Sequence, residues 1–268
     1  MMRIDKFFSE LGLKSRSEIK QDIKKGLVKV DGKIVKESDF RIDEKKAAVE
    51  YKGEIIAFEK YVYYILNKPE GFVTARSDDK DRTVMDLIED KRADLSPVGR
   101  LDKDTTGLLI ITNDGGLNHK LMSPKSHVPK TYFAVIEGEL RSDAQKLFET
   151  GIDIGDDKPC KSAKLKLIEY DEKLCWFFCK PNDKSDIKGS PESDRKILSF
   201  AEITITEGRY HQVKRMVAAV GGKVMRLKRV AIGGLMLPSD LAEGEYKKVS
   251  LEYLNEHINS KSGKVTVE

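Results

Sequence analysis

The chain has 268 residues, enough for two domains, and its 49 basic and 45 acidic residues give a net charge of only +4. Hydrophobic residues make up 39% and charged residues 35%, as in soluble globular proteins, and no apolar stretch reaches the ~18 residues of a membrane-spanning helix. The N-terminus carries acids where a secretory signal would be apolar, and the three cysteines lack CxxC spacing, so we expect a cytoplasmic protein without disulfides or a thiolate zinc site.

The first sixty residues predict a compact unit of two helices and a hairpin. Apolar residues recur at helical spacing over residues 4–11. Ser15 and Glu18 fit a capping box that opens a second helix. Asp31 and Gly32 then form a type I′ turn signal between alternating apolar residues, which indicates a hairpin.

The second helix carries cations four residues apart on its outer face. A helix, a basic helix and a DG hairpin in this order resemble the S4 RNA-binding domain over residues 2–48. The simpler alternative is an amphipathic helix with solvated lysines. The resemblance implies contacts with RNA phosphates, which position the RNA without reading its sequence, by Arg3, Lys14, Arg16, Lys20 and Lys24.

From residue 61 onward, strands and helices mix without regular βαβ alternation or internal repeats. This pattern predicts an α+β protein whose second domain has a mixed, largely antiparallel sheet with flanking helices. Ser142 is expected to cap one of these helices, and residues 180–196, which are almost free of apolar side chains, to form a long hairpin loop or a disordered excursion. The expected domains are 1–58 and 59–255, with a C-terminal tail at 256–268. Strands are expected at 61–66, 108–112, 131–138, 200–206 and 224–233, and helices at 115–121, 141–151 and 210–222.

The basic residues are concentrated in one segment. Residues 205–230 contain seven lysines and arginines and a single acid, Glu207, so this segment carries +6 and the remainder of the chain −2. A basic patch of this kind is typical of nucleic-acid binding, because it displaces counterions from phosphates. A solvated charged face explains the charge alone equally well.

No phosphate-binding loop, zincin or hydrolase motif occurs in the sequence, and the four histidines lack ligand spacing, so we expect neither a metal nor a cofactor. The remaining candidate is the polar segment GRLDKDTTGLL at residues 99–109, which leads directly into a buried strand. Its carboxylates and hydroxyls could form a reaction site, and Gly107 allows close backbone approach. By spacing alone, a charged turn remains the simpler interpretation.

The segment VGRLDKDTTGLLIITNDG is similar to the signature of the pseudouridine synthases. LNKPEGFVT, SPKSHVPKTYFAV and EGRYHQVKRMVAAVGGKVMRLKRVAIGGLML occur in the order that the family uses, so the resemblance covers about residues 2–250. The S4-like unit is similar to that of the branch that modifies ribosomal RNA, and SPKSHVPKTY together with DKDTTGLL is most similar to the subgroup acting on small-subunit 16S rRNA. The resemblance implies conversion of a uridine in ribosomal RNA to pseudouridine, with ribosomal RNA or a subunit assembly intermediate as partner. We expect a monomer.

The resemblance assigns three catalytic residues. Asp102 corresponds to the essential aspartate, which acts as nucleophile or as base; the order of bond-making steps stays open. Tyr132 is expected to stack on the target uracil. Lys214 is expected to keep Asp102 ionised while the site closes, at a position where relatives often have arginine.

The target uridine must leave the RNA stack before it can react. The resemblance makes Arg100 a candidate to fill the vacated place, and it places His211, Gln212 and Arg215 where they could hold the RNA backbone. His211 and Arg215 lie four residues apart and are expected on one side of a helix. For Gln212, an ordinary surface polar residue is a comparable alternative.

Two other functions compete with this one. The first is a non-catalytic S4-containing RNA-binding or ribosome-assembly protein that has kept the fold, although such a protein would be expected to have lost one of the three catalytic residues. The second is an aminoacyl-tRNA synthetase fragment, suggested by LMSPKS at residues 121–126. No nucleotide-binding histidine pair or doubly wound sheet pattern supports it.

Overall fold

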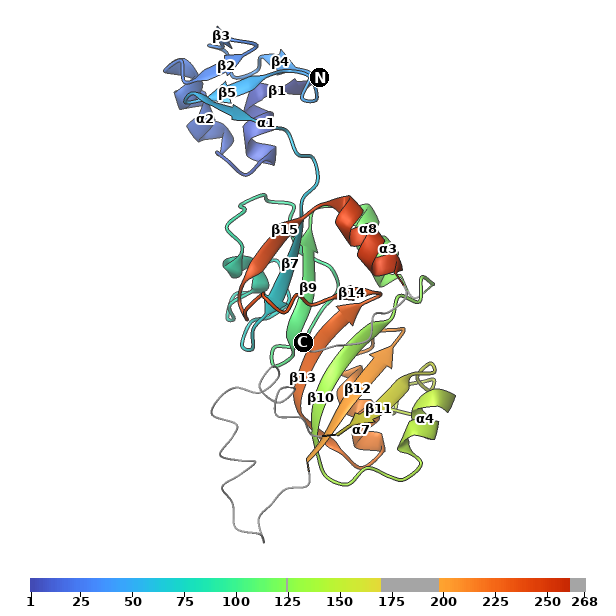
Figure 1. Cartoon of the computed structure of the whole chain (residues 1–268). Helices are drawn as coiled ribbons and strands as arrows, with labels where there is room; N and C mark the ends of the chain where they lie inside the picture. The colour runs from blue at the N-terminus through green and yellow to red at the C-terminus, as the bar shows by residue number, and fades with distance from the viewer. Residues whose placement is uncertain (124, 170–197, 261–268) are drawn as a thin grey trace.

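The computed structural model describes residues 1–123, 125–169 and 198–260 (Figure 1). The loop predicted at 180–196 lies outside them. Within the described residues, no helix is long and apolar enough to cross a membrane.

The N-terminal unit packs two short helices on small sheets around its own core. Its elements are β1 (Met2–Arg3), α1 (Ile4–Glu10), α2 (Arg16–Lys24), β2 (Val28–Val30), β3 (Lys33–Ile34), β4 (Arg41–Ile42), β5 (Val49–Tyr51) and β6 (Glu54–Ile56). β1 pairs with β4, and a second sheet has the order β3-β2-β5-β6. The predicted capping box is confirmed, since Ser15 and Glu18 bond to each other's backbone N–H groups. The predicted hairpin is confirmed as well, with φ of 50° at Asp31 and 77° at Gly32 between β2 and β3.

The remainder of the described chain is built on one nine-stranded sheet. Its main path is β11-β12-β10-β13-β9-β7-β15, with β14 on β13 and β8 on β9. All pairs are antiparallel except β13 with β9, so the predicted α+β class with a mixed, largely antiparallel sheet is confirmed. The strands are β7 (Tyr63–Lys68), β8 (Ser96–Pro97), β9 (Thr106–Thr112), β10 (Lys130–Glu137), β11 (Lys164–Ile168), β12 (Leu198–Ile205), β13 (Lys223–Ile232), β14 (Leu235–Met236) and β15 (Tyr246–Val249).

Helices cover both faces of this sheet. They are α3 (Gly115–Met122), α4 (Ala144–Thr150), α7 (Gln212–Ala219) and α8 (Leu251–Asn259), with a 3₁₀ turn η1 at Val84–Leu87. Alternate residues of β7 enter different cores: Tyr63 and Ile65 pack with residues of α3 and α8, whereas Tyr64 and Leu66 belong to the cluster that includes α4 and α7. α3 and α8 lie side by side on one face (Figure 1). Because both faces are covered, every residue of β7 is buried, and its apolar residues do not alternate with polar ones.

Gly107 brings the two halves of the sheet together. It has φ +100°, and a Cβ atom there would lie 2.2 Å from the carbonyl oxygen of Arg229, so only glycine fits. The close approach lets β9 run parallel to β13, with Gly107 opposite Arg229. The polar loop that precedes β9 is therefore delivered to the middle of β13.

Two details differ from the sequence predictions. Ser142 does not cap α4: the N-cap is Asp143, whose carboxylate accepts two bonds from Arg141 instead of capping the helix. The tail predicted from residue 256 begins inside α8. That helix continues to Asn259 because Ile258, only 8% exposed, packs into the core.

Candidate active site

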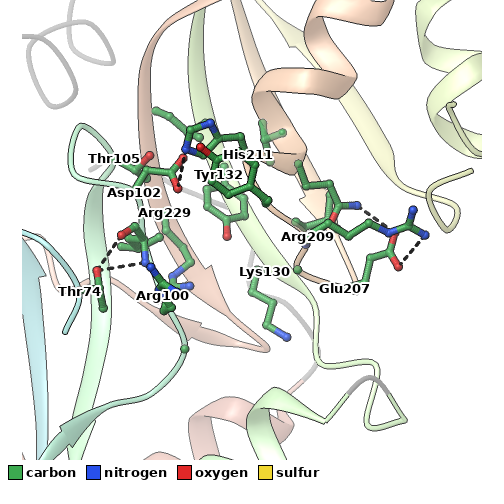
Figure 2. A pocket seen from close by; sticks show the side chains of 18 of the residues that line it. Thr74, Arg100, Asp102, Thr105, Lys130, Tyr132, Glu207, Arg209, His211 and Arg229 are labelled. Atoms are coloured by element: carbon green, nitrogen blue, oxygen red, sulfur yellow. Dashed lines mark hydrogen bonds and ion pairs between the residues drawn. The ribbon is translucent and has the colours of Figure 1, made fainter. Parts of the chain in front are cut away.

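An open cavity of about 650 Å³ lies against the middle of the large sheet. Its wall combines the loop before β9, the facing parts of β10 and β13, and the segment that leads into α7 (Figure 2). The predicted site residues that line it are Arg100, Asp102, Tyr132, His211, Gln212 and Lys214. Arg215 does not line it.

The backbone around Asp102 is fixed by two side chains from β7 and the segment that follows it. The Thr74 hydroxyl donates to the carbonyl of Leu101 at 2.7 Å and accepts from the N–H of Leu101 at 3.1 Å (Figure 2). The Lys68 ammonium, fully buried, donates to the carbonyls of Lys103 and Thr105 at 3.3 and 2.8 Å. The position of the Asp102 carboxylate is therefore set by contacts on both sides of it in the chain.

The Asp102 carboxylate meets two groups from the segment that opens α7. Lys214 Nζ lies 3.1 Å from Oδ2, and His211 Nε2 lies 3.5 Å from Oδ1. Lys214 also donates to both carboxylate oxygens of Asp104, at 2.6 and 2.9 Å. One ammonium group thus joins two carboxylates of the polar loop.

Lys214 is held in its charged form by this arrangement. Burial acts to lower the pKa of Lys214, but its hydrogen bonds to Asp104 and Asp102 outweigh burial and raise that pKa above its usual value. At Asp104, burial acts to raise the pKa, and the hydrogen bond from Lys214 overcomes it, so this pKa is lowered. The site keeps a cation beside Asp102 throughout the neutral pH range.

Tyr132, the third residue of β10, projects into the cavity beside Asp102 and His211 (Figure 2). Its side chain is only 8% exposed, because β12 and β13 flank it on either side. Tyr132 therefore offers a ring within the cavity, held by the sheet.

His211 and Arg215 do not share a helix face as predicted. His211 has φ 47° and is the N-cap of α7, so its ring turns toward Asp102 and stacks on Tyr210 with centroids 3.9 Å apart. Arg215 lies within the helix and points elsewhere. Arg100 is exposed at the cavity wall (Figure 2).

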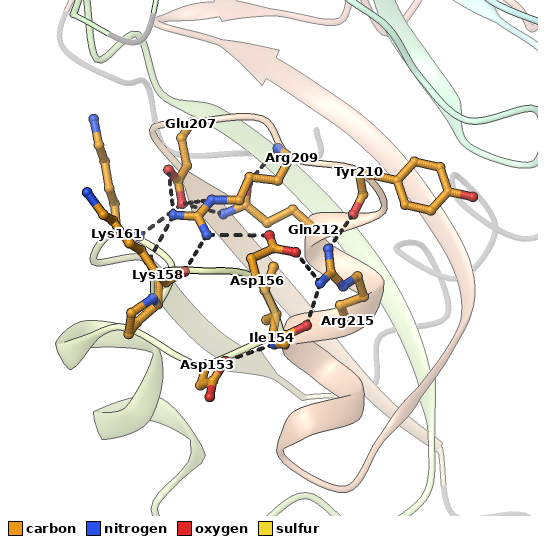
Figure 3. A network of polar contacts seen from close by, with 12 residues as sticks. Asp153, Ile154, Asp156, Lys158, Lys161, Glu207, Arg209, Tyr210, Gln212 and Arg215 are labelled. Atoms are coloured by element: carbon orange, nitrogen blue, oxygen red, sulfur yellow. Dashed lines mark hydrogen bonds and ion pairs between the residues drawn. The ribbon is translucent and has the colours of Figure 1, made fainter.

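Arg215 and Gln212 are occupied by internal contacts (Figure 3). The Arg215 guanidinium donates to the Asp156 carboxylate and to the carbonyls of Ile154 and Tyr210. Gln212 is 4% exposed, so it is no surface residue; its amide accepts from the N–H of Arg209 and donates to Glu207. Both side chains hold the segment that presents His211 and Lys214, and the predicted role of Arg215 as an RNA contact has no geometric support.

The predicted contacts in the N-terminal unit lie on β1, on α2 and just before α2. Arg16, Lys20 and Lys24 are exposed on α2, and Lys14 is half-buried. Arg3 is exposed as well, but its guanidinium donates twice to the buried Asp5 carboxylate, at 3.1 and 2.9 Å. Among the predicted contacts, the three cations of α2 are exposed and have no ion pair in the described residues.

Sequence reasoning assigned no individual role to several residues that shape the site. Lys68 and Thr74 lie in LNKPEGFVT, a segment used for the resemblance without a role for either side chain, and Asp104 lies two residues after Asp102. Their partners are distant in sequence, so no local pattern reveals them. Within the described parts of the chain, no three histidine, cysteine, aspartate or glutamate side chains gather as a metal site would require.

Comparisons with known proteins identify the family of the chain. The profile of the RNA pseudouridylate synthase family matches residues 62–219, and that of the S4 domain matches residues 2–46. An uncharacterized RNA pseudouridine synthase, YtzG, from Bacillus subtilis is 38% identical over 95% of this chain and 97% of the relative. Ribosomal small subunit pseudouridine synthase A from Escherichia coli is 36% identical over 94% of this chain and 97% of the relative. A solved structure described as a pseudouridylate synthase has 32% identity and a TM-score of 0.60, covering 96% of this chain and all of its own.

Proposed function

The chain belongs to the RNA pseudouridylate synthase family, and from this membership we propose that it isomerises one uridine of small-subunit 16S ribosomal RNA, with Asp102 as the essential group. The observation that carries the assignment of Asp102 is its place in the cavity, 3.1 Å from Lys214 and beside Tyr132. A non-catalytic descendant of the fold would not need to keep these three side chains together.

Each of the three side chains has a part in the reaction. Uridine and pseudouridine contain the same atoms, so the enzyme must break the C1′–N1 bond, turn the base and join C5 to C1′. Asp102 acts as nucleophile or base, and the Lys214 cation keeps it ionised when RNA excludes water from the site. Tyr132 stacks on the uracil during the turn, which keeps the detached base in place.

The uridine reaches this cavity only after it has left the RNA stack, which costs a few kcal/mol. Arg100 is exposed at the cavity wall, where it can fill the place that the base vacates. His211, whose Nε2 lies 3.5 Å from Asp102 Oδ1 in the same cavity, orients the substrate near the carboxylate. We propose that Gln212 and Arg215 stabilise the segment that carries His211 and Lys214 and do not contact RNA directly.

The small-subunit assignment rests on similarity to the Escherichia coli synthase over nearly the whole of both chains. The exposed α2 cations Arg16, Lys20 and Lys24 provide a second, positioning contact with RNA phosphates. We propose that the protein acts in the cytoplasm as a monomer, on ribosomal RNA or a subunit assembly intermediate, with residues 1–58 as the S4 unit and the catalytic domain following from residue 59.

The decisive experiment maps pseudouridine in ribosomal RNA from cells that lack the gene. We expect one site in small-subunit RNA to disappear, to return with the wild-type gene, and to remain absent with Asp102→Asn. Asparagine is nearly isosteric but can act neither as nucleophile nor as base, and such losses commonly amount to several orders of magnitude in rate. Unchanged maps in the deletion strain contradict the proposed substrate, and turnover by purified Asp102→Asn at a tenth of the wild-type rate contradicts the role of Asp102.

A further inference from the structure

Two buried cations, Lys130 and Arg229, line the cavity together with Tyr132. Lys130 lies two residues before Tyr132 on β10, so both side chains point to the same side of the sheet. Arg229 lies opposite Tyr132 on β13. Lys130 is 8% exposed and Arg229 2% exposed, and both are visible in the cavity in Figure 2.

Neither cation has an anionic partner among the described residues. Lys130 Nζ has one long hydrogen bond, 3.4 Å, to the carbonyl of Leu121. Arg229 Nε donates to the carbonyl of Leu108 at 2.8 Å, and its buried Nη2 has no partner in the described part of the chain. Buried charges are normally paired, since an unpaired one costs several kcal/mol.

The electrostatics of Lys130 agree with this geometry. Burial, together with the positive charge of Arg229, lowers the pKa of Lys130 to about 8. Other buried lysines of this sheet are compensated differently: Lys228 lies 3.7 Å from Glu243, and Lys68 donates to three backbone carbonyls. The cavity therefore contains two cations that have no anionic partner among the described residues. A ligand that enters the cavity is the remaining source of that anion.

We propose that Lys130 and Arg229 form a binding site for an oxyanion of the substrate RNA. Two sources supply this chemistry: a phosphate of the flipped nucleotide, or the uracil itself while it is detached from the sugar. The inference rests on the proposed function, because it takes the cavity as the place where uridine reacts.

The detached uracil carries a negative charge for a definite reason. When the C1′–N1 bond breaks, its electron pair stays on the base and is shared among N1, O2 and O4. The charge disappears when C5 bonds to C1′, the C5 proton leaves and N1 takes up a proton, so atoms and electrons balance. Preorganised cations aimed at such developing charge lower the barrier in a desolvated site.

The test uses Lys130→Met and Lys130→Gln in the full-length protein. Met keeps the apolar stem and removes the charge, whereas Gln keeps a donor for the Leu121 carbonyl. Lys228→Met is the matched control, since Lys228 is also buried on this sheet but lies outside the cavity. Melting temperatures verify the fold; Lys130→Met should melt no lower than the wild type, because it removes an uncompensated buried charge.

Single-turnover rates at saturating RNA and dissociation constants at several salt concentrations separate the two sources. If the site stabilises the detached uracil, the saturated rate falls about 10²-fold while RNA affinity is unchanged. If the site binds a phosphate, affinity falls, the salt slope flattens by about 0.7 to 0.9, and the saturated rate is retained.

Wild-type rate, affinity and salt slope in both Lys130 variants would overturn the inference. The small-subunit assignment fails in a different way, namely if the wild-type enzyme converts a uridine of large-subunit RNA instead. The same variants are then compared on that RNA, so the two failures remain distinct.

Discussion

Lys68→Met tests whether a buried ammonium group holds the loop that carries Asp102. Lys68 is fully buried and donates to the carbonyls of Pro69, Lys103 and Thr105 at 3.1, 3.3 and 2.8 Å. Losing three hydrogen bonds from a charged donor costs about 2 kcal/mol each. About 3 kcal/mol of this is offset, because burial lowers the pKa of Lys68 from 10.5 to about 8 and so disfavours its charged form. We expect a net decrease of about 3 kcal/mol in the free energy of unfolding at pH 7.

The pH dependence of this decrease identifies its cause. The pKa of Lys68 in the folded chain, about 8, lies below its unfolded value of 10.5, so the unfolded state binds more protons between these values. The Lys68 contribution to wild-type stability therefore rises with pH in this window, by about 2 kcal/mol between pH 7 and pH 9.5. Lys68→Met lacks this rise, so the difference between the two proteins should widen by that amount.

Denaturant unfolding of the full chain at both pH values measures the difference. Lys247→Met is the control, since Lys247 is exposed on β15 next to the strand that carries Lys68. Because the loop also positions Asp102, the single-turnover rate should fall about 10²-fold, as misplacement by about 1 Å can cause. A pH-independent stability difference, or a wild-type rate despite the reduced stability, would refute the reasoning.

Three further predictions concern the remaining cations. Lys214→Met should lower the saturated single-turnover rate by about 10² and Lys214→Arg should restore much of it, because the cation beside Asp102 returns; a change in RNA affinity alone would make Lys214 a phosphate-binding residue. Arg215→Met should lower the melting temperature and leave the salt dependence of RNA binding unchanged, since its guanidinium is bonded internally; a flatter salt slope would contradict this. The exposed α2 cations are neutralised by Arg16→Gln, Lys20→Gln and Lys24→Gln. The salt slope of RNA binding, measured by titration at several salt concentrations, should then flatten by about 0.7 to 0.9 for each RNA phosphate that the protein no longer neutralises. An unchanged slope would show that α2 does not bind RNA.

Local features of this protein could be predicted from its sequence because their causes are local. The capping box needs only Ser15 and Glu18 three residues apart, and the hairpin needs only Asp31 and Gly32 at positive φ. The buried stripe of α7 and the strands of the large sheet follow from apolar periodicity. Here the conformation and its cause lie within a few neighbouring residues.

The site combines both kinds of information. Resemblance to a family directed attention to Asp102, Tyr132 and Lys214, and the structure brings all three to one cavity. No spacing predicts that Lys214 also joins Asp104, since the two residues are 110 positions apart. Helical periodicity placed His211 on the same helix face as Arg215. His211 itself has φ 47° and is the N-cap residue, so its side chain points away from that face.

The compensation of buried charge is decided by the tertiary structure alone. Arg215 and Lys130 are both basic residues in polar sequence segments, yet one is bonded to Asp156 and the other faces the cavity without an acid among the described residues. Sequence determines which side chains can be charged and which faces are apolar. Which charged side chains lie close together depends on the tertiary structure, in particular on the close approach of β9 to β13 that Gly107 allows beside the cavity. The physical reason is that electrostatic energy depends on distance and burial rather than on order in the chain.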